Sequence, residues 1–370
     1  MKWLSSNKIA FVYGADANWG QLPERDLELT RELVRLKKET GFPHTYFVNS
    51  AKNATERIYD IAKLLQEAGL AKGATLSMQS WDKNTLTQIK RSNIRLKTYT
   101  DLQAKFKSTG TPTYSELIVG LPGETLDSFC AGIDQSIEAG CHDGLVIYPC
   151  RVLPGTEMAK PAYRVKHGIV TNMTAILANH TDITSKDIGP VEYEETIVAT
   201  KTMPHADWLE AQRIAWFVEV FFVLGIARLP LLRLRERGVK VTDFAQWALR
   251  CDVLDRARIE AYLASQDRGE PEVPRGGLEA FGNIRWPIDE ASWLALMAQK
   301  DETYAELLAL VEAFCDARGL DKYAVGVQAN MARLKHWTDG VSPSDPATFA
   351  REVLWFGRRG GSMLRLEVES

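Results

Sequence analysis

The stretch that decides the fold is Thr113–Phe129, which reads TYSELIVGLPGETLDSF. An apolar run of strand type, Leu117–Val119, stops at Gly120, and a short loop with a second glycine leads to Glu124. The helix predicted after Glu124 has apolar residues at helical spacing, namely Leu126, Phe129, Cys130, Ile133 and Ile137. A strand, a tight loop and an amphipathic helix form the repeating unit of an α/β barrel. The glycines would let a ligand approach the backbone and the free N–H groups of the helix start, although a plain structural turn is the alternative.

The same unit recurs along the first half of the chain. Runs of strand type lie at Ile9–Tyr13, Thr45–Val48, Thr75–Met78, Ser115–Val119 and Leu145–Tyr148. Helical patterns fall between them, as at Asp26–Lys38 and Ala54–Ala68, and Asn53 with Glu56 has the spacing of a capping box. Alternating strands and helices predict parallel βα units. The sequence therefore predicts an α/β fold, a partial (β/α) TIM-like barrel of about five units, because the pattern changes after Pro161.

Small and polar residues gather where the five predicted strands end, and chemistry in such barrels lies at those carboxyl ends. They include Gly14, Asp16, Asn18 and Gly20, then Asn49, Ser50, Lys52 and Asn53, then Gln79, Ser80 and Asp82, then Gly120, Gly123 and Glu124, and finally Pro149, Arg151, Pro154, Gly155, Thr156 and Glu157. Each residue alone is more typical of a turn or a cap. Five strand ends of one character favour a shared polar site.

Four segments in this order resemble the core of radical S-adenosylmethionine enzymes. They are FVYGADANWG (Phe11–Gly20), LSMQSWDKNTLTQIKRSNI (Leu76–Ile94), SELIVGLPGETLDSF (Ser115–Phe129) and VIYPCRVLPGTEM (Val146–Met158). The resemblance extends over roughly Ile9 to Met158 and is closest to the group that usually carries a cobalamin-binding domain ahead of the radical domain. It implies S-adenosylmethionine, a 4Fe-4S cluster and cobalamin as candidate cofactors, and a small-molecule substrate.

The resemblance also implies which residues contact S-adenosylmethionine. Near the methionine amino group it places Asp16, Ala17 and Asn18, where this chain departs from the family's glycine-rich consensus. At the ribose it places Ser77 and Gln79. Along the adenine it places Ile118 and Gly120, and at the adenine edge the strand residues Ile147, Tyr148 and Pro149. In the family a cluster bound by a CxxxCxxC loop reduces the sulfonium, and the resulting 5′-deoxyadenosyl radical abstracts hydrogen from the substrate.

The cysteines of this chain depart from that pattern. The five are Cys130, Cys141, Cys150, Cys251 and Cys315, and none has the spacing CxxxCxxC or CxxC. In the family the cluster loop precedes the strand that corresponds to Ile9–Tyr13. We therefore predict no metal ligand in this chain. Cys150, at a strand end, is a candidate for a role at the site rim.

Two explanations of the missing motif are open. One is an incomplete gene product or a misassigned start, with the cobalamin domain and the cluster loop upstream; a buried-type strand so soon after Met1 favours it. The other is a protein that lost the cluster and kept the scaffold. On either view we expect this polypeptide alone not to generate a radical, and a separate chain carrying the cluster or the cobalamin domain is a possible partner.

Composition narrows the class of protein. A length of 370 residues indicates more than one domain, and 45% apolar residues suffice for globular cores. A net charge of −3 gives no basic bias toward nucleic acid. Few, unevenly spaced cysteines and no cleavable signal pattern favour the cytoplasm. The most apolar stretch, Ile214–Leu232, is interrupted by Glu219 and Arg228, so we predict a buried helix and no membrane span.

The predicted domains are a barrel-like domain over 1–160, a connecting segment over 161–206 and a helical domain over 207–370. Helices are expected over Asp207–Gln266 and Glu290–Leu320. Seven tryptophans of this half are expected to pack in a core, or alternatively to line a substrate pocket: Trp208, Trp216, Trp247, Trp286, Trp293, Trp337 and Trp355. His205 is a candidate acid or base on the substrate side.

The sequence favours a fragment of a radical S-adenosylmethionine enzyme that methylates or rearranges a biosynthetic intermediate. Two alternatives stay open. One is a non-catalytic binding or assembly subunit on a barrel without a cluster. The other is an unrelated barrel lyase or hydrolase that uses Asp16, Lys52 and Glu124, in which Lys52 would need a depressed pKa.

Overall fold

The structure is a computed structural model of the whole chain. It describes residues 1–51, 56–71, 74–91, 93, 95–108, 113–142, 144–176, 192–251, 255–267 and 285–335. The chain forms two compact units. The first unit comprises Met1–Leu117 and Gln135–Val146, and the second comprises Ile118–Asp134 and Ile147–Ser370.

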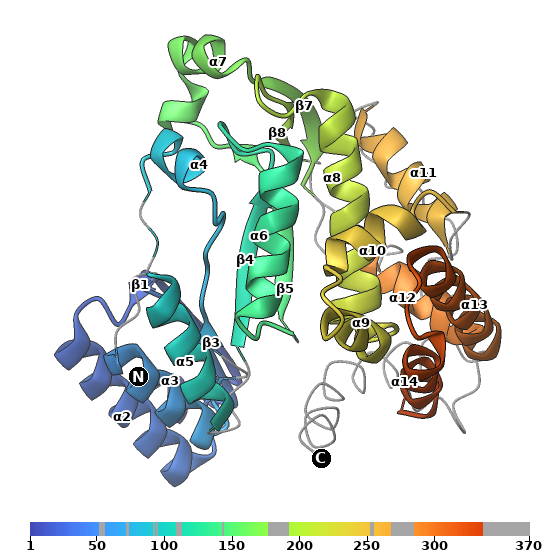
Figure 1. Cartoon of the computed structure of the whole chain (residues 1–370). Helices are drawn as coiled ribbons and strands as arrows, with labels where there is room; N and C mark the ends of the chain where they lie inside the picture. The colour runs from blue at the N-terminus through green and yellow to red at the C-terminus, as the bar shows by residue number, and fades with distance from the viewer. Residues whose placement is uncertain are drawn as a thin grey trace. The chain divides into compact units, whose positions relative to one another are not determined.

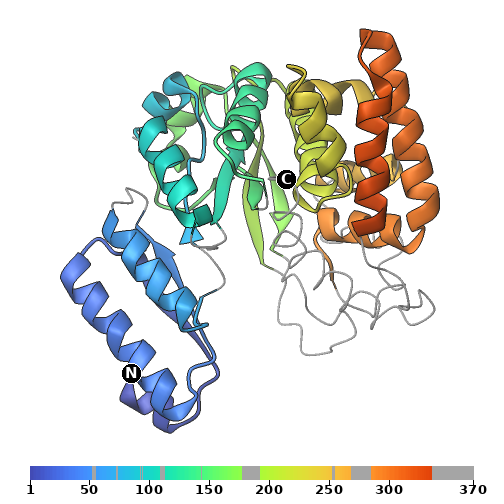
Figure 2. The ribbon, with the colours of Figure 1, turned by 60° about the horizontal axis from the view of Figure 1, so that its bottom comes forward.

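The first unit begins with two parallel strands covered by helices on one face. Strands β1 (Phe11–Trp19) and β2 (Thr45–Ser50) pair in parallel, with Phe11 opposite Thr45. Helices α2 (Pro23–Thr40) and α3 (Glu56–Glu67) pack together against them, drawn in blue in Figures 1 and 2. The core beneath these helices consists of Trp19, Leu33, Tyr46, Ile61, Leu65 and Leu70. The helical spacing of the apolar residues in each helix explains which face is buried.

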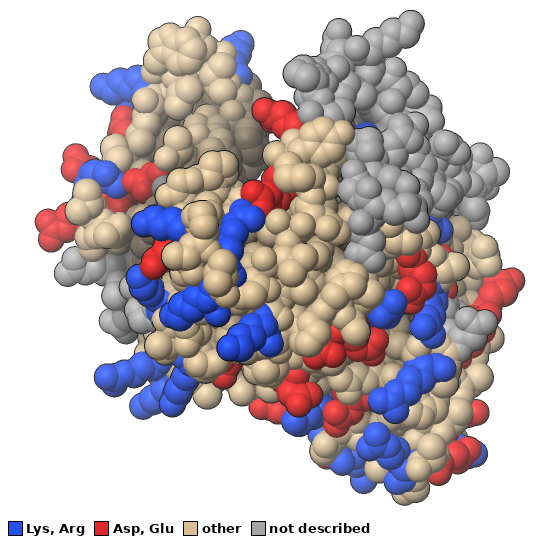
Figure 3. Space-filling view, turned by 90° about the horizontal axis from the view of Figure 1, so that it is seen from above, with Lys and Arg blue, Asp and Glu red and all other residues tan. Residues whose placement is uncertain are grey.

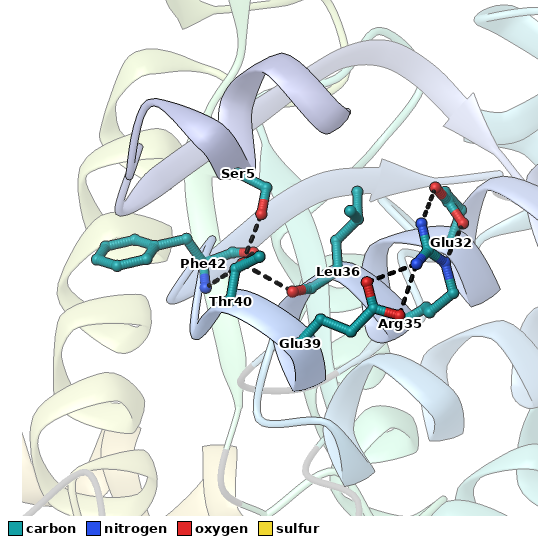
Figure 4. A network of polar contacts seen from close by, with 7 residues as sticks. All are labelled: Ser5, Glu32, Arg35, Leu36, Glu39, Thr40 and Phe42. Atoms are coloured by element: carbon teal, nitrogen blue, oxygen red, sulfur yellow. Dashed lines mark hydrogen bonds and ion pairs between the residues drawn. The ribbon is translucent and has the colours of Figure 1, made fainter.

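Polar contacts join the short helix α1 (Lys2–Ser6) to the end of α2 (Figure 4). The hydroxyl oxygens of Ser5 and Thr40 lie 2.5 Å apart, and the Thr40 hydroxyl also donates to the Leu36 carbonyl oxygen at 2.8 Å. One turn earlier, the Arg35 guanidinium bonds to Glu32 and Glu39, at the helical spacings i,i+3 and i,i+4. Exposed pairs of this kind contribute only tenths of a kcal/mol, so burial of the apolar face stabilises α2 more than they do.

The fold-deciding stretch forms the middle strand of a second sheet. Strands β3 (Ala74–Thr75), β4 (Thr113–Val119) and β5 (Leu145–Pro149) have the order β3-β4-β5, and β3 and β4 run parallel. Helices α4 (Lys83–Gln88) and α5 (Leu96–Ser108) connect β3 to β4, and α6 (Leu126–Glu138) connects β4 to β5. The division between the two units passes through β4, α6 and β5.

The second unit contains a third, antiparallel sheet. Strands β6 (Arg151–Val152), β7 (Val170–Ala175) and β8 (Tyr193–Ala199) have the order β6-β8-β7. A 3₁₀ turn, η1 (Glu157–Ala159), and helix α7 (Pro161–His167) lie between β6 and β7. Strands β7 and β8 of this sheet lie in the predicted connecting segment, 161–206, to which the sequence analysis assigned no particular strand or helix.

The rest of the second unit is helical. Its elements are α8 (His205–Phe217), the π-helix η2 (Val218–Val223), α9 (Arg228–Arg235), α10 (Val241–Ala248), α11 (Arg256–Asp267), α12 (Ile288–Ala298), α13 (Lys300–Arg318) and α14 (Lys322–Lys335). Helix α14 packs against both α13 and α9 (Figure 2). Aromatic rings fill the core between helices, with Phe244 edge-on to Phe314 at 5.0 Å. The prediction that tryptophans of this half pack in a core is confirmed for Trp208, Trp216 and Trp293, which are 1 to 2% exposed.

The apolar stretch Ile214–Leu232 is buried as predicted, but it is not one helix. It runs from α8 through η2, bends, and continues in α9. The buried Arg228 side chain bridges the bend by donating to the carbonyl oxygens of Phe222 and Val223. In the part of the chain that the structure describes, no single helix is long and apolar enough to cross a membrane. One pair of helices, His205–Val223 and Arg228–Arg235, has the required length and apolarity when taken together, but the two are bent by 102°.

The predicted α/β class is confirmed, and the helices expected at Asp26–Lys38 and Ala54–Ala68 appear as α2 and α3. The strands form three small sheets among the described residues, so the barrel and the three domain boundaries stay predictions. Acidic and basic side chains are interspersed on the face drawn in Figure 3, as expected for a net charge of −3.

Candidate functional site

The two residues predicted at the ribose lie beside one carboxylate in the first unit. The Ser77 hydroxyl, in a residue that is 8% exposed, donates to Oε2 of Glu116 at 2.5 Å. The backbone N–H of Gln79 donates to the carbonyl oxygen of Glu116 at 2.7 Å. Gln79 has a φ of 61°, a left-handed conformation that is uncommon outside glycine and ends the extended run. Ser77, Gln79 and Glu116 thus form one polar group at the carboxyl end of β3.

Two further side chains enlarge this group. The Asn93 amide donates to the carbonyl oxygens of Met78 and Ser80, both at 2.7 Å. Its Oδ1 atom and the Nε atom of Arg91 are buried without a hydrogen-bond partner among the described residues. Burial lowers the pKa of Arg91, and the charge of Glu116 opposes this change. A buried polar atom without a partner costs about 1–3 kcal/mol, so these two atoms mark a place where a ligand can supply the missing bonds.

The residues predicted at the methionine end lie elsewhere in the first unit, late in β1. Asp16 accepts a hydrogen bond from the backbone N–H of Asn18 and pairs with Arg25, each at 2.9 Å. The Asn18 N–H and the Arg25 guanidinium lower the pKa of Asp16. Asn18 is exposed, and Ala17 lies in the strand, with its side chain outside the described part. The Asp16 carboxylate is therefore already engaged by a cation of its own chain.

The residues predicted at the adenine lie in the second unit. Ile118 is half-buried, Gly120 is buried with a φ of 88°, and Tyr148 is 47% exposed beside the half-buried Pro149. The backbone N–H of Ile147 donates to Oε1 of Glu219 in the π-helix η2 at 2.8 Å. The Ile147 N–H is therefore already used. If Ile147 contacts the adenine as predicted, the contact has to involve its other atoms.

Backbone bonds join the carboxyl ends of β4 and β5 to the middle of β8 near Gly120. The Cys150 N–H donates to the Val119 carbonyl oxygen at 2.9 Å, and the Ile197 N–H donates to the Cys150 carbonyl oxygen at 2.8 Å. A Cβ atom on Gly120 would lie 3.3 Å from Cδ1 of Trp208 and 3.4 Å from its Nε1. Glycine is required there both by the positive φ and by the indole.

Cys150 itself does not have the features of a metal ligand or nucleophile. It is 3% exposed, and burial, helped by the charge of Glu124, raises the pKa of its thiol to about 12. The thiolate is the form that binds metals and attacks substrates. All five cysteines are free, and the described residues hold no group of three or more His, Cys, Asp or Glu side chains that could bind a metal ion. The residues present therefore do not fit a 4Fe-4S cluster.

His205 and Trp208 lie together at the start of α8. Their rings stack at 5.8 Å with 14° between planes, and Nδ1 of His205 donates to the carbonyl oxygen of Val198 at 3.1 Å. Through these contacts His205 links the start of α8 to β8. Its role as an acid or base stays a prediction. Lys52, one of the residues of the lyase or hydrolase alternative, lies outside the described residues.

The structure thus brings Ser77 and Gln79 together in the first unit, and Gly120 next to the strand end at Cys150 in the second. Sequence reasoning missed three side chains, Arg91, Asn93 and Glu116, and it did not connect Trp208, expected in a core or a substrate pocket, with Gly120. The first three stand in the segments that carry the family resemblance, and Glu116 faces Ser77 across neighbouring extended segments. That alternation was the available signal for Glu116. Nothing in the sequence pairs Trp208 with Gly120.

No protein-family model matches the chain. Two curated relatives do. The cobalamin-dependent radical SAM methyltransferase TokK of Streptomyces tokunonensis is 30% identical over 330 residues, which are 83% of this chain and 47% of that protein. The 2-(S-pantetheinyl)-carbapenam-3-carboxylate methyltransferase of Streptantibioticus cattleyicolor is 30% identical over 336 residues, 85% of this chain and 48% of that protein.

Solved structures give a weaker likeness. The radical S-adenosylmethionine methyltransferase TsrM from Kitasatospora setae, with tryptophan and a SAM analogue bound, has a TM-score of 0.40 and 17% identity over 58% of this chain and 44% of TsrM. A second TsrM structure, with cobalamin and a [4Fe-4S] cluster, has a TM-score of 0.37 and 19% identity over 51% of this chain and 33% of TsrM. At these TM-scores the likeness supports no conclusion about this chain.

The match to the curated relatives extends well beyond the motif region, Ile9 to Met158, that carries the sequence resemblance. This homology argues against the alternative of an unrelated barrel lyase or hydrolase. By this homology the chain is a relative of the cobalamin-dependent radical S-adenosylmethionine methyltransferases, the group that its motifs resemble, and it spans about half the length of the curated relatives it matches.

Proposed function

We propose that this chain is the S-adenosylmethionine-binding and substrate-binding part of a cobalamin-dependent radical methyltransferase that acts on a small biosynthetic intermediate. The observation that carries the proposal is the 30% identity with TokK over 330 residues. The polar group at the end of β3 supports it, since its buried donors and acceptors suit a nucleoside with an attached amino acid. The finer expectations of a TIM-like barrel and a cytoplasmic location belong to the same proposal, the latter supported by five free cysteines.

Each residue of the polar group has a definite task in this proposal. Glu116, with Ser77 beside it, accepts hydrogen bonds from the vicinal hydroxyls of the ribose. Arg91 binds the carboxylate of the methionine moiety, because a guanidinium has several N–H donors for it. Asn93 fixes the backbone after Met78 through its amide. S-adenosylmethionine supplies, when bound, a transferable methyl group on a cleavable sulfonium. The protein residues bind and orient it and keep water away.

Calorimetric titration of S-adenosylmethionine into the full chain, without a cluster, tests this site. We expect saturable binding, and we expect Glu116→Gln to weaken it about tenfold or more, because the charged acceptor of the ribose hydroxyls is lost. Glu32→Gln, on the exposed face of α2 in the same unit, is the matched control and should bind as the wild type does. Absence of binding by the wild type, or equal binding by Glu116→Gln, would contradict the proposal.

A second candidate function follows from the cysteines. Since none of them is spaced for a cluster and the described residues hold no metal-binding group, the chain could serve as a binding subunit whose cluster and cobalamin come from a separate polypeptide. DNA sequence immediately upstream of the gene separates the possibilities. An in-frame CxxxCxxC there supports one longer protein, whereas a stop codon with a neighbouring gene for a cluster protein supports two chains.

A further inference from the structure

We propose that the backbone at Gln79 is held in a strained turn because ligand binding requires that turn, and that Asn93 is the positioning residue that maintains it. The inference rests on the proposed function and adds to it a conformational requirement of the same site. Strained backbone is concentrated at functional sites, where the surrounding structure maintains it. Gln79, Asn93 and Glu116 all belong to the first unit, so the argument involves one compact unit alone.

The conformation of Gln79 is unusual in two respects. Its φ of 61° lies in the left-handed region, which residues other than glycine seldom adopt. The Ser80 N–H donates to the Met78 carbonyl oxygen at 2.8 Å, which closes a three-residue γ-turn with Gln79 at its centre. A γ-turn with a positive φ at its central residue is the rare and strained form. Glycine would adopt this conformation without strain, so glutamine at this position lowers the stability of the fold.

Asn93 maintains the turn from both sides. Its side-chain nitrogen donates one hydrogen bond to the carbonyl oxygen of Met78 and another to that of Ser80, both at 2.7 Å. Because both bonds start from one nitrogen atom, they hold the two carbonyl oxygens close together across Gln79. The turn is therefore imposed by a side chain that lies 13 residues or more away in the sequence.

The turn fixes the extended segment that carries Ser77 against β4. The Ser77 hydroxyl donates to Oε2 of Glu116 at 2.5 Å, and the Gln79 N–H donates to the carbonyl oxygen of the same glutamate at 2.7 Å. Glu116 is thus held through its side chain and its backbone. The Gln79 side chain is half-buried, and its carboxamide has no hydrogen-bond partner among the described residues. The turn consequently leaves this carboxamide available to a ligand that binds at Glu116.

The experiment separates the backbone conformation from the side chain. Gln79→Ala removes the carboxamide and keeps the backbone strain, whereas Gln79→Gly removes both. Lys8→Gly is the matched control for strain, because Lys8 is exposed in the same unit and has a φ of 55°. Asn93→Ala removes the amide, and Asn7→Ala is its control, since the exposed Asn7 amide donates to the Trp3 carbonyl oxygen at 2.8 Å. S-adenosylmethionine is titrated calorimetrically into each full chain, and the melting temperature is recorded without ligand.

We expect Gln79→Gly to change stability and affinity in opposite directions. Its melting temperature should rise by at least about 1 °C, because the strain is removed. It should bind S-adenosylmethionine at least about threefold more weakly than Gln79→Ala, since only the fraction of molecules that adopt the turn is ready to bind. Lys8→Gly should also raise the melting temperature but leave the affinity unchanged.

For Asn93→Ala we expect a lower melting temperature and an affinity about fivefold weaker, because the turn is no longer maintained. Asn7→Ala should bind as the wild type does. A merely structural role of Asn93 would lower the melting temperature and leave the affinity of the folded protein unchanged.

Three outcomes would overturn the inference alone, provided that Glu116→Gln still weakens binding and the proposed function stands. A melting temperature of Gln79→Gly at or below that of the wild type means that the turn is not strained. Equal affinities of Gln79→Gly and Gln79→Ala mean that binding does not require the turn. An unchanged affinity of Asn93→Ala means that Asn93 only supports the fold. Absence of binding by the wild type would instead reject the proposed function and this inference together.

Discussion

Single residues in the second unit hold the strand end beside Gly120, and Glu219 is one of them. Its carboxyl group accepts the Ile147 N–H inside a π-helix, a form of helix that often occurs at functional sites. Burial raises the pKa of Glu219 well above its ordinary value, and the negative charge of Asp289 raises it further. The neutral carboxylic acid is thus favoured in the folded protein.

This shift gives a pH-dependent prediction for Glu219→Gln. Above the ordinary Glu pKa of about 4.3, Glu219 is ionised in the unfolded chain while it is still neutral in the folded protein. Ionisation of Glu219 therefore favours the unfolded state increasingly as pH rises. Glutamine keeps an oxygen for the Ile147 N–H and cannot ionise. We expect Glu219→Gln to raise the melting temperature at pH 8 by at least about 2 °C and to match the wild type near pH 4. Glu302→Gln, exposed on α13, should show no such dependence; a lower melting temperature of Glu219→Gln at pH 8 would reject the argument.

Gly120 permits a second prediction at this scale. A side chain at a φ of 88° is strained, and Gly120→Ala would also press on the Trp208 edge. Gly155 has a φ of 79° with no atom within 4 Å of a built Cβ, so Gly155→Ala carries the backbone strain alone. In urea unfolding we expect about 1 kcal/mol of destabilisation for Gly155→Ala and roughly 1 kcal/mol more for Gly120→Ala. Equal losses would mean that the indole does not press on this position.

At the scale of elements, a side chain of α6 organises the start of α10. Asp134, which is 5% exposed, accepts hydrogen bonds from the backbone N–H and the hydroxyl of Thr242. The first N–H groups of a helix have no partner within the helix. A carboxylate from another helix therefore satisfies a donor that the sequence of α10 does not satisfy itself, since Lys240 at its N-cap makes no side-chain cap.

Removing that carboxylate should destabilise the second unit. We expect Asp134→Ala to cost about 1–3 kcal/mol in urea unfolding, because the Thr242 N–H and hydroxyl are left buried and unpaired. Asp127→Ala, exposed in the first turn of the same helix, should cost at most about 1 kcal/mol through the helix dipole. If the two variants unfold at the same urea concentration, the contact between α6 and α10 has no stabilising role.

Element by element, the sequence predicted most helices and strands because their apolar spacing is strong. Strand β3 is an element whose bounds the apolar spacing did not predict correctly. The pattern predicted Thr75–Met78, but the strand is Ala74–Thr75, and the chain from Leu76 to Gln79 runs beside β4 with only some of its bonds. The left-handed Gln79 interrupts the ladder, and no local pattern announces a positive φ at glutamine.

At the scale of the whole molecule, the absence of cluster ligands in the sequence gives a direct prediction. Four of the five cysteines are buried, and none is spaced as CxxxCxxC. After anaerobic reconstitution of the chain alone with iron and sulfide, and desalting, we expect fewer than about one iron per chain. Iron and acid-labile sulfide assays provide the measurement. A brown protein that retains about four irons would contradict this expectation.

The candidate site was predictable to the extent that local motifs carry it. Gln79 and Gly120 were named because they stand at predicted strand ends, where parallel sheets bind ligands, and Ser77 was named through the family resemblance alone. Alternation along the strands could have indicated that Glu116 faces Ser77, whereas the pairing of Trp208 with Gly120 becomes visible only in the structure. Such pairings depend on tertiary packing, which a periodic pattern does not encode.

The boundary between the compact units crosses the chain within β4, within α6 and within β5. Neither unit is one continuous piece of polypeptide. Residues 118–134 belong to the second unit although residues of the first unit stand on both sides of them in the sequence. A gene cut anywhere between residues 118 and 146 would therefore leave both units incomplete. Two fragments made by such a cut and expressed separately should be insoluble. Shorter versions of this protein should therefore keep residues 113–149 intact.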